Sequence, residues 1–203
     1  KTETKVQSSN LNAGSGALMV GASDAANVDT VIATASGALG AAIGVVTNII
    51  TTDHSTGVVV TGTSTDKSSL TGTSVSVDAD AKEGISSILI AASGAQYAAV
   101  SASVNVNRQL SDVSAAVDQT EVLGSFAQNA NYLGRITTSA ITAAGSQYAA
   151  VPISVVINYA DNAVSSSVAH SILRAEGQSA SVGANRISEF SSLNVTASGA
   201  MYG

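Results

Sequence analysis

Histidine is the side chain best suited to acid–base chemistry near neutral pH, and this sequence has two, His54 and His170. With a serine and an aspartate nearby, either could belong to a Ser-His-Asp arrangement for nucleophilic catalysis. Serine and aspartate are frequent in this chain, however, so their presence alone carries no geometric information. The GxSxG turn that exposes a nucleophilic serine is missing. Histidines in solvated loops are the simpler interpretation, and we expect the protein not to be an enzyme.

Acidic residues are the second group that could do chemistry. Asp78 and Asp80 resemble the start of a calcium-binding loop. An EF-hand loop needs an oxygen ligand at its fifth position and glycine at its sixth, where this chain has Lys82 and Glu83. The GGxGxD calcium repeat is absent, and there is no cysteine for thiol or zinc chemistry. The sequence predicts a solvated turn here, with no metal and no cofactor.

Tyrosine and asparagine recur in phase with a long repeat. The tyrosines in phase are Tyr97, Tyr148 and Tyr202, and the asparagines are Asn48, Asn107 and Asn158. The tyrosines could form an exposed stripe that binds glycans or a packing ladder, and the ladder is favoured because stacked strands often align like side chains. For the asparagines we expect a buried structural ladder.

The repeat itself indicates how these residues are positioned. Residues 92–107 (ASGAQYAAVSASVNVN) match residues 143–158 (AAGSQYAAVPISVVIN) without a gap, at an offset of 51. Weaker copies flank them, so that units begin near glycines 16, 37, 94, 145 and 199. Residues 1–203 are therefore expected to be one repetitive segment of a longer chain, with 51–57 residues per unit.

Within a unit the pattern is that of β-strands. Residues 74–81 and 102–107 alternate polar and apolar side chains, which indicates strands with one buried face. Repeated units that cannot bury an apolar face alone are typical of solenoids. We therefore expect an all-β parallel solenoid, a right-handed β-helix. Each unit divides into two turns of roughly 26 residues or three of roughly 18, which gives about ten turns and a rod about 50 Å long.

Further details follow from this architecture. Residues 53–57, 128–131 and 159–162 are expected at corners, because they contain glycine, asparagine or aspartate. Valine, isoleucine and alanine are expected inside, Val104 among them, with serine, threonine and asparagine outside. A helix over residues 33–46 and an antiparallel sandwich remain the alternatives for the fold.

Composition narrows the class of partner. Net charge is −6, and the eight basic residues are scattered, which excludes the basic stripe of a nucleic-acid-binding protein. The longest apolar run, residues 37–50, is shorter than the roughly 18–20 residues of a membrane span. Charged residues make up 11% of the chain and aromatic residues 3%, which is unusual for a globular enzyme.

The SGAL and SGAQYAAV…SVNVN segments give the chain a resemblance to a known family. It is similar to the repeats of large bacterial exoproteins of the filamentous haemagglutinin and leukotoxin type. The resemblance implies a structural stalk or fibre of a secreted or surface-exposed adhesin, located outside the cell, and it implies no catalytic residues.

Partners and the alternative function follow from the same picture. Because neither end carries a visible cap, we expect each end to meet flanking repeats of the same chain or to associate end to end with another copy. A host-cell or matrix surface is a further expected partner. A carbohydrate-binding or carbohydrate-cleaving β-helix remains the alternative, since enzymes share this fold class.

Overall fold

The computed structural model describes residues 1–175 and 178–202, and the regular structure in them is entirely β. Because no helix occurs in these residues, none is long and apolar enough to cross a membrane. The strands are β1 (Thr2–Gln7), β2 (Asn10–Asn12), β3 (Ala17–Ala38), β4 (Ala41–Thr61), β5 (Ser68–Ala95), β6 (Ala98–Asp118), β7 (Thr120–Ser146), β8 (Ala149–Ala169), β9 (Ile172–Arg174) and β10 (Ala180–Ala200).

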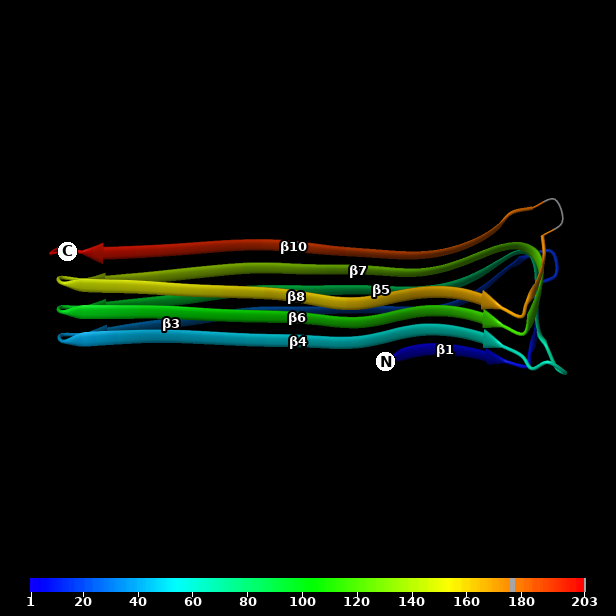
Figure 1. Ribbon diagram of the computed structural model, residues 1–203, viewed down its shortest axis with the longest axis horizontal. Helices are drawn as coiled ribbons and strands as arrows, with labels where there is room; N and C mark the ends of the chain where they lie inside the picture. Colours follow the sequence, from blue (N-terminus) through cyan, green and yellow to red (C-terminus); the bar gives the residue numbers. More distant parts are fainter. Residues whose placement is uncertain (176–177, 203) are drawn as a thin grey trace.

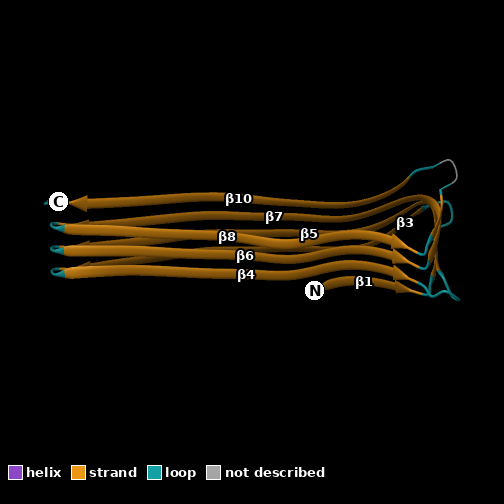
Figure 2. Cartoon of the chain, viewed as in Figure 1, coloured by secondary structure: helices purple, strands orange, loops and turns teal. Residues whose placement is uncertain are grey.

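Two parallel sheets lie face to face, and the chain alternates between them (Figure 1). The first sheet has the order β1-β4-β6-β8. The second has the order β10-β7-β5, with β2 and β3 pairing the far side of β5 and β9 pairing β7. Figure 2 shows the loops gathered at the two ends of the long strands. The prediction of an all-β fold with parallel strands is confirmed, and the helix and the antiparallel sandwich are excluded.

The register shows that the strands are far longer than expected. Ala98 pairs with Ala149, 51 residues later, with one strand of the second sheet between them. One circuit of the chain therefore takes the whole interval, where two or three shorter turns were expected. At roughly 3.3 Å per residue, the 21 residues of β6 extend about 70 Å. The first sheet has four strands, so the expected stack of about ten turns is wrong.

The glycines and the expected corners can now be placed. Gly37, Gly94, Gly145 and Gly199 form one column across the second sheet, whereas Gly16 lies in the turn before β3. Residues 53–57, 128–131 and 159–162 lie inside β4, β7 and β8, so the corner prediction was wrong. The polar side chains that suggested turns are held by neighbouring strands instead, because Asn129 and Asn131 donate to Asp78 and Asp80 at 2.9 and 2.8 Å.

An apolar core fills the half of the molecule away from the tyrosine turns. Its larger side chains are fully buried: Val58, Val60, Leu70, Val75, Val77, Val113, Val117, Val122, Phe126 and Tyr132. Burial of such side chains is the main favourable contribution to folding. Here the prediction of an aliphatic interior holds.

On β6, in the half near the tyrosine turns, the expected pattern is reversed, whereas Val46 of β4 and Leu89 and Ala91 of β5 remain buried as expected. Ser101, Ser103, Asn105 and Asn107 are fully buried between the sheets, and Val104 faces outward. Alternation predicts one buried face, but it does not say which face that is. Polar residues are accommodated inside because they hydrogen-bond one another across the sheets, as Ser103 does with Thr142 and Asn105 with Ser87. The expected burial of Val104 was therefore wrong.

Candidate functional site

The three repeat tyrosines form a stacked ladder. Tyr97 and Tyr148 have ring centroids 5.7 Å apart with an interplanar angle of 14°, and Tyr148 and Tyr202 are 5.8 Å apart at 29°. All three are more than half exposed, at 55%, 54% and 62%. A sugar that stacks on an aromatic ring needs a free ring face, and within this ladder the rings cover one another. The facing sides of these rings are therefore covered, whereas one face of Tyr97 and one face of Tyr202 have no aromatic neighbour in the described residues.

The ladder has a defined end. The backbone N–H of Tyr97 donates to the carbonyl of Gly40 at 3.0 Å, so glycine precedes the tyrosines in this column. The first ring therefore has no aromatic neighbour below it. Tyr97, Tyr148 and Tyr202, which share one phase of the sequence repeat, lie in successive coils.

The asparagines form a buried network in two adjacent columns. Asn48 donates to Asn105 at 3.3 Å, and Asn107 donates to Asn158 at 2.9 Å. Ser87, on the opposite sheet, accepts from both Asn105 and Asn107, at 2.7 and 3.2 Å.

Asn48 was expected in the phase of Asn107, and the structure pairs it in register with Asn105 instead. Asn105 and Ser87 were not predicted as members of the network. Serine and asparagine alternate with alanine and valine over residues 101–107. This pattern identifies Asn105 as a member of the network only when it is known that the polar face is the buried one.

A buried carboxylate interrupts the interior between the two halves. Glu83 is only 5% exposed, and it accepts hydrogen bonds from Ser111, from Thr52 at 3.3 Å and from the Tyr132 hydroxyl at 3.4 Å. No Lys or Arg pairs with it among the residues that the structure describes. The sequence predicted a solvated turn at this position, and that prediction was wrong. Charge burial of this kind is tolerated because hydroxyl donors surround the carboxylate.

Tyr132 allows a pH test of this cluster. Burial raises the pKa of Tyr132 to about 12, and the adjacent Glu83 charge acts in the same direction. Because the folded-state pKa lies above the unfolded value near 10, the neutral phenol stabilises the fold below pH ~10, and this contribution is lost as pH rises through ~12. We expect Tyr132→Phe to lose about 1 kcal/mol at neutral pH and to show a smaller decline in stability between pH ~10 and ~12 than the wild type. Urea denaturation across this range measures both effects, and parallel declines would contradict the assignment.

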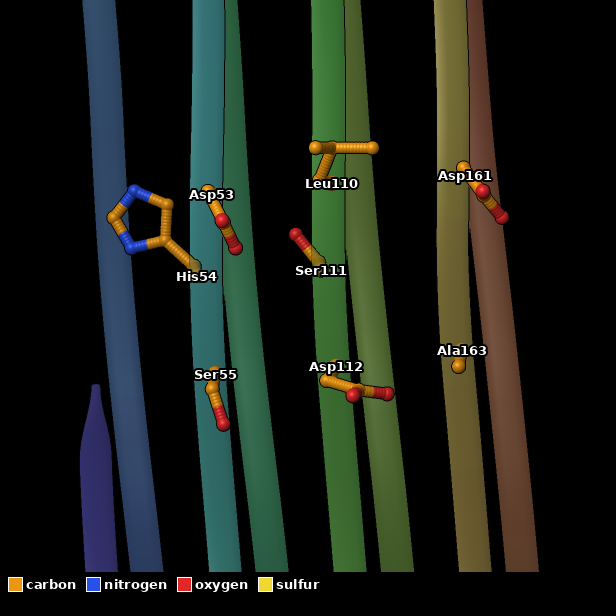
Figure 3. Close-up of a pocket in the computed structure, with 8 residues that line it drawn as sticks. All are labelled: Asp53, His54, Ser55, Leu110, Ser111, Asp112, Asp161 and Ala163. Carbon is orange, nitrogen blue, oxygen red and sulfur yellow. The ribbon is translucent and has the colours of Figure 1, made fainter.

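A shallow hollow on the outer surface of the first sheet gathers three carboxylates. Asp53, Asp112 and Asp161 come from β4, β6 and β8, and Figure 3 shows them on adjacent strands, with Leu110 and Ser111 between them. No tyrosine lines it in the described chain. The Tyr159 hydroxyl donates to Asp161, one of the three carboxylates, at 3.3 Å.

The two histidines each contact one aspartate and lie far apart in the fold. His54 Nδ1 is 3.1 Å from Asp24, and His170 Nδ1 is 3.0 Å from Asp118. Within residues 1–175 and 178–202, no serine hydroxyl bonds to either ring. No group of three or more potential metal-ligating His, Asp or Glu side chains occurs in the same residues.

Comparison with protein-family models, with curated proteins and with solved structures finds no match to this chain.

Proposed function

We propose that this chain is a structural repeat segment, the stalk or fibre of a bacterial exoprotein of the haemagglutinin type. In this proposal it is a right-handed parallel β-solenoid whose sequence unit of 51–57 residues is one coil, secreted or displayed on the cell surface. The observation that carries the proposal is the alignment of like residues in successive coils, inside and outside. The tyrosine rings stack on one another, and Asn107 donates a hydrogen bond to Asn158. In this proposal both sets of side chains stabilise the contact between successive coils.

The long strands favour a structural role for a second reason. Each strand of the interior pairs along its full length with the next coil, as β6 does with β8 over Ala98–Asp118. Such an array distributes its stability over many equivalent hydrogen bonds and nearest-neighbour contacts. The extent of about 70 Å runs along the strands, and further coils would lengthen the array in the perpendicular direction, by about 4.8 Å for each coil.

The location can be tested with antibodies raised against the chain. We expect them to label intact, unpermeabilised cells of the source bacterium or to detect the parent protein in the medium. Labelling that requires permeabilised cells would contradict an extracellular role.

A carbohydrate-binding or carbohydrate-cleaving protein remains the second candidate, because Asp53, Asp112 and Asp161 share one surface hollow. A glycan array and a panel of polysaccharide substrates test it directly. We expect no binding and no cleavage. Binding that is lost in Asp112→Asn or in Tyr148→Ala would favour this candidate and overturn the purely structural proposal.

A further inference from the structure

We propose that copies of this chain stack head to tail, with β10 of one copy pairing in parallel with β3 of the next. This inference rests on the proposed structural role and names its partner as a second copy. Both strands lie at the edges of the second sheet, where unpaired backbone groups can accept another strand. Two observations favour the second copy: the register of the sheet and the charges at its two edges.

The register of the sheet already relates the two edges. Leu18 pairs with Val75, Val75 with Phe126, and Phe126 with Ala180. If one more coil continued this pattern, Ala180 would lie beside Leu18 of the second copy, and Ala200 beside Ala38. The whole of β10 would then pair along β3.

Like residues would stack across this junction, as they do inside the molecule. Residues 20–22 read Val-Gly-Ala, as do residues 182–184, and residues 34–38 read Thr-Ala-Ser-Gly-Ala, as do residues 196–200. In the proposed register each of these segments faces its own match. Within the chain the same alignment joins Gly94 to Gly145.

Opposite charges would meet at one position of the junction. Asp24, Ala81, Tyr132 and Arg186 form one inward-facing column, with Asp24 at one open end and Arg186 at the other. Stacking therefore places the backbone of Arg186 one strand spacing, about 4.8 Å, from that of Asp24 of the second copy, with both side chains on the same face of the sheet. No like charges face each other, because Glu189 would lie beside Asn27, and Asp29 beside Ser191.

An incomplete hydrogen-bond set marks the same place. Asn162 on β8 is 4% exposed, and neither its amide nitrogen nor its amide oxygen has a partner in the described residues. Arg186 donates to its backbone carbonyl at 2.8 Å. At the other end the one side chain that contacts the Asp24 carboxylate, within the described part of the chain, is His54 at 3.1 Å. Because the Asn162 amide is already covered within one copy, only Arg186 and Asp24 of this group are accessible to a second copy.

The smaller strands are compatible with the same junction. β1 pairs with β4 in the register that β8 continues, so β1 of the second copy would lie over the end of β8, with Val6 beside Val168. β2 would lie over β9 in the same way, with Leu11 beside Leu173. The 21-residue β10–β3 ladder would be the main contact.

Charge exchange tests the junction. The wild-type chain should show concentration-dependent assembly by sedimentation and form filaments by electron microscopy. Arg186→Asp places two aspartates at the junction, and Asp24→Arg places two arginines there. Each alone should weaken association about 100-fold or more. An equimolar mixture of the two variants restores opposite charges at every junction and should assemble again, as should the double variant.

The control is Asp29→Arg, which makes the same charge change on the exposed outer face of β3 and should leave assembly unchanged. Circular dichroism verifies that each variant is folded. If Asp24→Arg fails to fold, Asp24→Asn replaces it and should weaken association less and make it less sensitive to salt.

Two results would overturn the stacking. One is a folded wild type that stays monomeric at all concentrations. The other is assembly that persists in both single variants, which would indicate association through the apolar outer faces instead. Neither result touches the proposed structural role, which depends on the glycan and localisation experiments.

Discussion

Val113→Asp is expected to unfold the protein, or to lower its free energy of unfolding by about 4 kcal/mol or more. Val113 is 1% exposed and belongs to the main apolar cluster, with Val58, Phe126 and Val164 in the same cluster. A carboxylate there has no basic partner, and an unpaired buried charge is among the most destabilising changes known. Since globular domains have only about 5–15 kcal/mol of stability, the loss is large. Urea denaturation followed by circular dichroism measures it.

Val104→Asp is the matched control, on the same strand with the opposite orientation. Val104 faces outward between Thr47 and Val155, so its replacement adds a solvated charge to the surface. We expect a change within about 1 kcal/mol. A large loss for Val104→Asp and a small one for Val113→Asp would show that the two faces of β6 are assigned the wrong way round.

Asn107→Ala is expected to lower the free energy of unfolding by about 2–4 kcal/mol. The side chain of Asn107 is fully buried and donates to Ser87, to Thr138 at 2.9 Å and to Asn158 at 2.9 Å. Its removal leaves several buried polar groups without a partner, and each such group costs about 1–3 kcal/mol. The same denaturation experiment measures the loss.

The control for Asn107→Ala is Asn129→Ala on the outer face of β7. Asn129 makes one hydrogen bond, to Asp78, and water can replace it there. We expect a loss below about 1 kcal/mol. Equal losses at the two positions would mean that the interior network contributes no more than a surface contact.

An all-β fold with parallel strands could be predicted because two features are visible in the sequence itself. One is the match between residues 92–107 and 143–158, and the other is the alternation of polar and apolar residues. The tyrosine column was found for the same reason, since Tyr97 and Tyr148 lie at one offset. What could not be predicted was where the strands end. Asn129 and Asp78 are residue types that favour turns, but here they hydrogen-bond each other across neighbouring strands of successive coils. A prediction from a short stretch of sequence does not include such a long-range partner.

The orientation of the strands was missed for a related reason. A serine and asparagine face is normally the solvated one, and only the opposite sheet, with Ser87 and Thr138, makes it suitable for the interior. Glu83 was placed in a turn because its stabilising partners, Ser111 and Thr52, are on another sheet. Each error concerns a residue whose partners are distant in sequence.

That distance has a consequence for how the protein folds. In the described residues every ladder joins positions 51–59 apart, and no hairpin joins neighbouring strands. More than one full coil must therefore leave the ribosome or a secretion pore before the first native strand pair can form, which predicts a slow, topology-limited nucleation step. Once a first coil exists, each later strand can add to its finished edge, so growth proceeds in one direction along the chain. A denatured sample diluted to refold should accordingly show a lag that shortens when preformed coils are supplied as seeds.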